Sequence, residues 1–360
     1  MAMSPRFLVG LATLFRVLAN DGFSEEIFPR KDGAAEQRSP EDLTVVKDAL
    51  YRTMPPPPEG WRTASGALRL NEEWEKDHSK PWFIEYQMQG GQYVSAGVIL
   101  DNRDEVDWGL KIIEWGFSRM SQEGCFDHPD SYHSGAFFIE STAHALFLLQ
   151  DSPMSGDFAV RIDALKPKLL AAVRHMIRPE IHAYNWPEPS PDTEQRERKY
   201  PHRRYLDAAA IGETGVLCGD PELVRKSEWF VKDGIAFQKE DGVNPEKGGH
   251  DTSYQAVGIM YALRYYQLVA NKRLRTEMTP MVGKGLDWLA KRISPDGSID
   301  MSGNTRTGPT QELSRAGKPK GQDFRAMVEA FAHWGWLTGN DKFMAVAERI
   351  TRFMRSGKNG

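Results

Sequence analysis

The feature of this sequence that most restricts its fold is an internal repeat of a turn, a polar loop and a helix rich in small residues. The turns lie at residues 122–127, 240–244 and 295–300, and each places a glycine beside an acidic residue. The helices that follow them are expected at 135–149, 251–263 and 322–334. Such a recurring layout is typical of repeat architectures, in which each copy buries its apolar face against the next.

The opposite ends of the repeated units also resemble one another. Gly219 and Gly339 stand where a helix ends in the left-handed conformation, and Asp220 and Asn340 follow as residues that cap the next helix. These two segments predict short hairpins between antiparallel helices.

Helical periodicity dominates the chain from about Asn102 onward, and alternating, strand-like runs are few. Hairpins that pair a small-residue helix with an amphipathic helix suit a ring with close-packed inner helices. We therefore predict an all-α fold, an (α/α) toroid of five to seven helical hairpins, with residues 61–360 as one catalytic domain. The expected helices span about 105–121, 136–150, 158–178, 205–218, 222–239, 252–270, 277–293, 323–337 and 341–356.

Residues 1–60 are predicted to be a separate N-terminal segment. Pro55–Pro58 form a polyproline strap or spacer, and a short helix is expected before it. Arg6, the apolar stretch 7–15 and the small-residue site 17–19 resemble a weak secretory signal, which Arg16 interrupts. The alternative is a short amphipathic helix. We expect a periplasmic or secreted protein, with a cytoplasmic location as the alternative.

Composition argues against several classes of partner. The 46 Lys and Arg residues and 50 Asp and Glu residues give a net charge of −4, without a long basic run, so nucleic acid is not an expected partner. No stretch of 18 apolar residues is present, and no membrane-spanning helix is expected. Cys125 and Cys218 form neither a disulfide framework nor a zinc cluster. No metal or nucleotide motif is found, and no cofactor is expected. The oligomeric state is left open.

Polar residues recur in the loops between the turns and the small-residue helices. His133, His250 and Arg306 occupy equivalent loops, and a fourth loop begins with Asn185 and Trp186 and reaches His202 and Arg203. In a toroid these loops fall at the same rim. The repeat therefore predicts that residues far apart in the sequence line one cleft.

His250 and Tyr254 are four residues apart across a helix start, so their side chains are predicted to lie one above the other. A histidine near neutrality and a desolvated phenol together suit proton transfer to and from a substrate. The alternative is that His250 caps the helix and Tyr254 packs in the core.

The loop residues suit an anionic sugar chain. His202, Arg203 and Arg204 form a cationic cluster that can clamp a carboxylate, and Trp186 offers a flat face for a sugar ring. Arg306, which Gly308 follows, can extend into the same cleft. The alternative is that these cations only brace solvated loops. The predicted ligand is an anionic polysaccharide.

Two reactions fit such a cleft. In β-elimination a base removes the proton next to a uronate carboxylate, and cations stabilise the enolate-like state. In hydrolysis two carboxylates flank the bond, and Asp251, Glu140 and Asp323 are the candidates. We favour elimination because the rim is richer in His, Tyr and Arg. For Glu140, the alternative interpretation is a buried hydrogen bond to His144, which is four residues away on the same helix face. A non-catalytic sugar-binding protein is the third possibility.

Three blocks of sequence carry a resemblance to a known family. Residues 130–140, residues 202–210 with the following Gly219-Asp220, and residues 249–255 resemble helical-toroid polysaccharide lyases acting on alginate or glucuronan, most closely polysaccharide lyase family 38. The resemblance spans roughly residues 80–355, and the charged loop 192–199 does not match the family.

This resemblance implies a metal-independent lyase. It implies Tyr254 as the acid, which can also serve as base, and His202 or His250 as the other proton carrier. Asn185, Arg203 and Arg306 would hold the uronate carboxylate.

Overall fold

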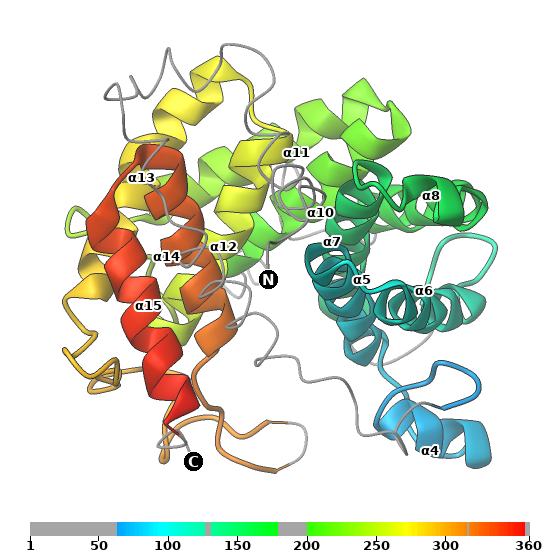
Figure 1. Ribbon diagram of the computed structural model, residues 1–360, viewed down its shortest axis with the longest axis horizontal. Helices are drawn as coiled ribbons and strands as arrows, with labels where there is room; N and C mark the ends of the chain where they lie inside the picture. The colour runs from blue at the N-terminus through cyan, green and yellow to red at the C-terminus, as the bar shows by residue number, and fades with distance from the viewer. Residues whose placement is uncertain (1–62, 127–130, 179–199, 315–316, 357–360) are drawn as a thin grey trace, which may run out of the picture. The chain divides into compact units, whose positions relative to one another are not determined.

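The computed structural model describes residues 63–126, 131–178, 200–314 and 317–356. These residues are mostly helical, with isolated β-bridges in place of strands, so the predicted all-α class is confirmed (Figure 1). The contacts between Cα atoms divide them into two compact units. Unit 1 holds residues 63–126, 131–178 and 210–227, and unit 2 holds 200–209, 228–314 and 317–356. The toroid and its single domain stay predictions, and the proline run and the N-terminal apolar stretch lie outside the described residues.

Unit 1 is built around three helices that pack against one another. The helix α5 packs against α6 and α7, and α7 also packs against α8. Aromatic and aliphatic side chains that include Tyr93, Trp108 and Ile112 form a buried cluster between these elements. The elements are α4 (Leu70–Lys76), η2 (Ile84–Gln87), α5 (Met88–Leu100), α6 (Arg103–Ser118), α7 (Ser131–Gln150), α8 (Ser155–Met176), the second part of α10 (His202–Cys218) and the first part of α11 (Pro221–Phe237).

Unit 2 contains the remaining parts of α10 and α11 and four further helices. In Figure 1, α14 lies beside α15, and these two helices pack together. The helix α12 packs against both α13 and α14. Tyr205, Tyr265 and Phe331 are among its largest fully buried side chains. The four helices are α12 (Thr252–Leu268), α13 (Lys272–Ala290), α14 (Phe324–Thr338) and α15 (Asp341–Arg355).

The nine helices predicted from periodicity are all present. For example, the helix expected at 205–218 is α10, which spans His202–Cys218. The helix expected at 341–356 is α15, which spans Asp341–Arg355. The helix α5 was missed because it lacks an amphipathic pattern. A Cβ atom on Gly91 would lie 2.1 Å from the backbone oxygen of Ser141, so the small residues of α5 serve close packing against α7.

The predicted turn repeat is confirmed in its backbone geometry. Each of the three turn glycines has a positive φ, of +87°, +95° and +90°. A Cβ atom on any of them would lie 2.2 or 2.3 Å from a backbone carbonyl oxygen of another helix, so only glycine fits. The pairs are Gly124 with Ala171 of α8, Gly242 with Lys284 of α13, and Gly297 with Arg349 of α15.

A fourth copy of the turn, which sequence reasoning missed, lies in unit 1. Gly66 has a φ of +94°, and a Cβ on it would lie 2.6 Å from the backbone oxygen of Lys111 in α6. Gly66 N donates to Thr63 Oγ1 at 3.1 Å, where the other copies use a backbone oxygen. The absence of an acidic residue beside Gly66 hid this copy from the search.

A buried glutamine ties the turn to the helices in two of the copies. Gln87 Nε2 donates to the oxygens of Gly66 at 3.0 Å and Ile112 at 2.9 Å, and Gln87 Oε1 accepts from Leu68 N at 3.1 Å. Gln255 is placed in the same way. Its partners are Gly242 O at 2.9 Å, Gly285 O at 3.4 Å and Asn244 N at 2.8 Å.

The two predicted helix hairpins are also present. Gly219 and Gly339 adopt positive φ values of +69° and +65°. Asp220 Oδ1 accepts from the backbone nitrogens of Glu222 and Leu223, while the side chain of Asn340 accepts from Lys342 N. These bonds satisfy backbone donors that a helix start leaves open.

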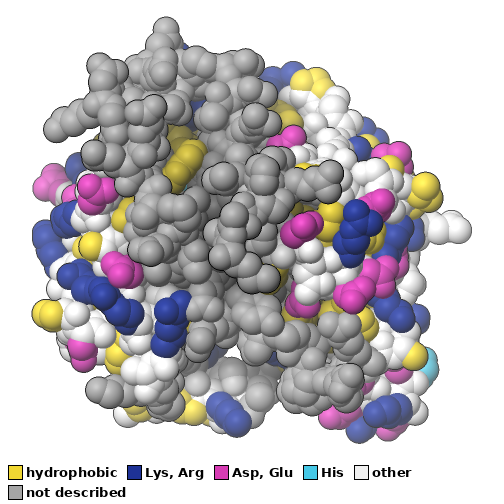
Figure 2. All heavy atoms as spheres, viewed as in Figure 1, with side chains coloured by type: hydrophobic (Ala, Val, Ile, Leu, Met, Phe, Trp, Pro, Cys, Tyr) yellow, Lys and Arg dark blue, Asp and Glu magenta, His cyan; other side chains and the backbone are white. Residues whose placement is uncertain are grey.

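The surface of the described residues mixes charges of both signs. On the face seen in Figure 2, Lys and Arg side chains lie among Asp and Glu side chains. Across the part of the chain that the structure describes, no helix combines the length and the apolar character needed to cross a membrane.

Candidate functional site

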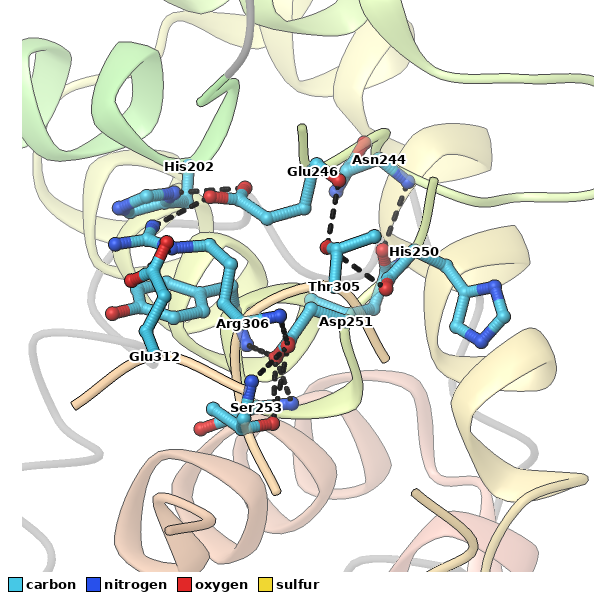
Figure 3. A network of polar contacts seen from close by, with 12 residues as sticks. His202, Asn244, Glu246, His250, Asp251, Ser253, Thr305, Arg306 and Glu312 are labelled. Carbon is cyan, nitrogen blue, oxygen red and sulfur yellow. Dashed lines mark hydrogen bonds and ion pairs between the residues drawn. The ribbon is translucent and has the colours of Figure 1, made fainter. Parts of the chain in front are cut away.

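A charged cluster in unit 2 brings together residues from four segments of the chain (Figure 3). The segments are the start of α10, the loop before α12, the start of α12 and the loop before α14. The members of the charged cluster are His202, Glu246, Lys247, Tyr254, Arg306, Glu312 and Lys320.

Asp251 fixes two parts of the cluster relative to each other. Its Oδ1 accepts from the backbone nitrogens of Ser253 and Tyr254, both at 3.1 Å, and so caps α12. Its Oδ2 accepts from the backbone nitrogens of Arg306 at 2.9 Å and Thr307 at 2.8 Å. A single buried carboxylate thus holds the helix start and the following loop together.

The loop that carries Arg306 is docked along its backbone as well. Thr305 N donates to His250 O at 3.0 Å, and Thr305 Oγ1 donates to Glu246 O at 2.8 Å. Asn304 Oδ1 accepts from Thr252 N at 3.1 Å. These bonds hold the backbone next to Arg306 in place, so the position from which its side chain extends is fixed.

Glu246 bridges a histidine and an arginine inside the cluster. Its Oε2 lies 3.0 Å from His202 Nδ1, and its Oε1 accepts from Arg306 Nη1 at 2.7 Å. The side chain of Glu246 is only 3% exposed and that of His202 only 1%. Both groups therefore interact in a medium that screens charge poorly.

Burial shifts the pKa values of both partners toward their neutral forms. It raises the pKa of Glu246 to about 7, against the attraction of Arg306. It lowers the pKa of His202 well below 6.5, and the nearby Arg306 and Arg203 lower it further. At neutral pH the imidazole is uncharged. With Nδ1–H directed to the Glu246 carboxylate, Nε2 is left as the basic nitrogen.

Tyr254 lies against the same residues. Its ring centroid is 4.6 Å from that of His202, and Arg306 Cζ lies 3.7 Å from the centre of the phenol ring. Lys320 Nζ donates to Tyr254 Oη at 3.3 Å. Burial raises the pKa of Tyr254, so the phenol keeps its proton at neutral pH and suits the role of a proton donor.

Glu312 gathers three cations beside the phenol. Its carboxylate accepts from Arg306 Nε at 3.1 Å and Lys320 Nζ at 2.7 Å, and it also contacts Lys247. Burial alone would raise the pKa of Glu312, but the bonds from Lys247 and Lys320 outweigh it and hold the pKa at about 2. Three cations here share one carboxylate, that of Glu312.

Three of the predicted site residues meet in the charged cluster, namely His202, Tyr254 and Arg306. Arg203 lies at its edge, with its guanidinium carbon 4.4 Å from the ring centre of Tyr200. The same ring lies 4.8 Å from the guanidinium carbon of Arg306. The aromatic face of Tyr200, which sequence reasoning did not select, therefore links the two arginines.

His250 does not stack with Tyr254 as predicted. The helix begins at Thr252 and its cap is Asp251, so His250 precedes the helix and does not share its face. Its Nε2 lies 3.1 Å from Ser302 O, its ring packs against Trp288 at 5.3 Å, and in Figure 3 the imidazole points away from the charged cluster. His250 takes part through its backbone oxygen instead.

Of the remaining predicted residues, only His133 is described, and it is not a member of the charged cluster. His133 is part of α7 in unit 1, where its ring lies 4.8 Å from that of Phe137. Asn185 and Trp186 lie outside the described residues. Their proposed contacts with substrate stay predictions.

The cluster also contains charged residues that sequence reasoning missed. Glu246 stands two residues before Gly248-Gly249, which was a signal that this loop turns sharply beside the site. Glu312 and Lys320 meet because Lys320 N donates to Glu312 O across a turn at 2.9 Å. Neither periodicity nor a motif marks that pairing.

The carboxylates considered for hydrolysis have other tasks. Asp251 is committed to backbone nitrogens, as described above, and Asp323 caps α14 by accepting from Ala326 N. Glu140 lies in unit 1 with His144 and Glu213, and one ligand atom from each of these three residues lies within 4.8 Å of the others. That group could hold a metal ion.

Comparison with known proteins adds no further identification. No protein-family model matches the chain, and a search of curated proteins finds no match. The resemblance to polysaccharide lyase family 38 therefore stays a prediction that rests on the residues of the three blocks.

Proposed function

We propose that the chain is a polysaccharide lyase that cleaves a uronate-containing polysaccharide, of the glucuronan or alginate type, by β-elimination. The observation that carries this proposal is the meeting of His202, Tyr254 and Arg306 in one charged cluster. A neutral imidazole, a protonated phenol and a fixed guanidinium are the groups that this reaction requires.

The proposed roles follow from the protonation states. His202 Nε2 is the base that removes the proton next to the uronate carboxylate, because the imidazole is neutral at the working pH. Tyr254 donates a proton to the departing glycosidic oxygen, because its raised pKa keeps the phenol protonated. Arg306 and Lys320 offset the charge that develops on the carboxylate. The negative charge of a bound uronate would also raise the pKa of His202 and strengthen it as a base.

Glu312 occupies the position that we assign to the substrate carboxylate. Arg306, Lys320 and Lys247 already bind one carboxylate there, so their spacing suits such a group. A uronate would displace Glu312 or share its cations. This exchange explains how a site with several cations stays neutralised without substrate.

The toroid and membership of polysaccharide lyase family 38 belong to the same proposal. They are supported by the four copies of the turn and by the helix hairpins. The periplasmic or secreted location rests on residues outside the described ranges.

Hydrolysis is the second candidate, and one observation favours it. Glu246, with its pKa raised to about 7, and Glu312, with its pKa lowered to about 2, have the unequal acidities typical of a glycosidase pair. However, both carboxylates are bound to Arg306. This arrangement leaves Glu246 poorly able to reach a glycosidic bond.

Incubation with alginate, glucuronan and related uronans tests the proposal. β-Elimination produces a new conjugated double bond, which is followed by its ultraviolet absorbance. Hydrolysis produces reducing ends without that absorbance, and a sugar-binding protein gives binding with neither product. Absence of the ultraviolet signal over the whole panel would overturn the assignment.

A further inference from the structure

A second group of ionisable side chains lies in unit 1. Glu140 and His144 are four residues apart on α7, and Glu213 comes from the second part of α10. One ligand atom from each lies within 4.8 Å of the other two. The side chains are largely buried, with Glu140 at 1% and Glu213 at 0% exposure.

We infer that Glu140, His144 and Glu213 form a binding site for one divalent transition-metal ion. The three residues supply two carboxylate oxygens and one imidazole nitrogen, which together suit Zn²⁺ and its neighbours in the first row. Mg²⁺ and Ca²⁺ are less suited because they prefer oxygen ligands alone. The inference does not depend on the proposed lyase reaction.

The distances support a shared ion. Ligands at about 2.0–2.2 Å from a tetrahedral zinc ion lie about 3.3–3.6 Å from one another. His144 Nδ1 and Glu213 Oε2 are 3.6 Å apart, which is longer than a good hydrogen bond and close to this ligand spacing. A small contraction of the group around an ion would complete the geometry.

The backbone holds two of the ligands in place. Residues four apart on a helix lie on the same face, so α7 itself sets the separation of Glu140 and His144. The helix is fixed against α5, where Ser141 Oγ donates to Met88 O at 2.7 Å. Ala143 and Ala145 beside His144 are fully buried. Ligands on packed helices lose little conformational entropy when an ion binds.

Charge and access agree with the same assignment. Two carboxylates held close together repel each other, and a divalent ion bound between them would offset that repulsion. The side chain of His144 is 13% exposed, so part of its ring reaches the surface of unit 1. Three protein ligands leave a coordination position for water.

The test uses the full chain with any purification tag removed and metals stripped by a chelator. Zn²⁺ is titrated in the presence of a chromophoric competitor, and Co²⁺ is titrated in parallel for its visible absorption. We expect one equivalent of Zn²⁺ to bind and one equivalent of Co²⁺ to give the spectrum of a low-coordinate nitrogen and oxygen site.

Variants decide which residues hold the ion. Glu213→Gln, which keeps the side-chain volume, and His144→Ala should each raise the Zn²⁺ dissociation constant at least about 30-fold, since each removes one of three protein ligands. His78→Ala, at an exposed histidine, is the matched control and should bind Zn²⁺ like the parent. Circular dichroism of the metal-free forms confirms that each variant is folded.

Two results would overturn the inference. One is a folded parent protein that binds well under one equivalent of Zn²⁺, which would mean that the three side chains do not hold an ion. The other is tight binding that Glu213→Gln leaves unchanged, which would place the ion elsewhere.

Discussion

The start of α12 in unit 2 and the start of α5 in unit 1 share one scaffold but differ in what they display. In both, a glycine with positive φ packs against a helix backbone, and a buried glutamine bonds to the turn. The glutamines, Gln87 and Gln255, are each preceded by a tyrosine. Tyr86 and Tyr254 therefore occupy equivalent positions.

The surroundings of the two tyrosines are unlike. Tyr86 lies near Arg69, whose guanidinium carbon is 5.4 Å from the ring centre. Tyr254 contacts His202, Arg306 and Lys320, as described above. The glycine turn and the buried glutamine are thus common structural features of both copies. The charged cluster forms in the copy at α12, where residues of the loop before α14 contact the tyrosine.

The largest effect is expected from removing one hydroxyl group. Tyr254→Phe should lower kcat for polyuronate cleavage by about 10³-fold, because the proton donor to the leaving oxygen is lost. The free energy of unfolding should change little, since the hydroxyl accepts a long hydrogen bond from Lys320 Nζ, at 3.3 Å. Initial rates from the ultraviolet signal measure kcat, and thermal unfolding measures the change in stability.

Tyr86→Phe is the matched control because it removes the same atom from the equivalent position of unit 1. Its kcat should equal that of the parent. Equal losses in the two variants, or full activity in Tyr254→Phe, would remove the phenol from the mechanism.

Gly242→Ala should destabilise the fold by about 3 kcal/mol, because a methyl group at a positive φ is strained and would collide with a neighbouring backbone. The added Cβ would lie 2.3 Å from Lys284 O. Gly66→Ala in the equivalent turn should behave alike, with its Cβ 2.6 Å from Lys111 O. Denaturant unfolding provides the measurement.

Gly219→Ala separates backbone strain from collision. Gly219 also has a positive φ, of +69°, but its Cβ would meet no atom within 4 Å. The loss should therefore be about 1 kcal/mol, from strain alone. If Gly242→Ala cost no more than this, the turn would not be packed as described.

Much of this architecture could be predicted from the sequence, and the reasons differ by element. Helical periodicity predicted α6 onward, and the spacing of glycine beside acidic residues predicted three turns. The helix α5 escaped because small residues on its buried faces leave no amphipathic pattern. Gly66 escaped because no acidic residue stands beside it.

The site was predictable only where its residues stand at loop ends and helix starts. Tyr254 and His202 were found in this way. Glu312 and Lys320 could not be, because their meeting depends on how an irregular loop folds. His250 was expected to share a helix face with Tyr254, but it precedes the cap residue Asp251 and lies outside the helix, so the four-residue spacing does not align the two side chains.

The buried glutamines test whether the two copies are equivalent in energy. Gln87→Ala and Gln255→Ala should each lower the free energy of unfolding by about 2 kcal/mol, since buried backbone groups lose their partners. The two losses, compared by denaturant unfolding, should agree within about 1 kcal/mol. A large loss in one copy alone would mean that the same hydrogen bonds contribute differently to the free energy of unfolding in the two copies.

The smallest effect concerns Glu312, the acid that binds the cations beside Tyr254. Glu312→Gln should lower the free energy of unfolding at pH 6 by about 1 kcal/mol, because the carboxylate is partly exposed and its ion pairs are screened. The folded pKa of Glu312, about 2, lies below the ordinary 4.5, so its contribution is present above pH 4.5 and is lost as the pH falls through 2. The parent and variant curves should therefore converge near pH 2.

Glu348→Gln is the control for this acid dependence, since Glu348 forms an exposed pair with Arg352 at 3.5 Å and should change stability little. The same Glu312→Gln protein also tests the proposed exchange of carboxylates. Without the charge of Glu312, Arg306 and Lys320 are more available to a uronate, so KM should fall by a few fold while kcat changes less. A raised KM would instead mean that Glu312 positions Arg306 and Lys320 for the substrate. The uronate would then bind beside Glu312 and would not displace it.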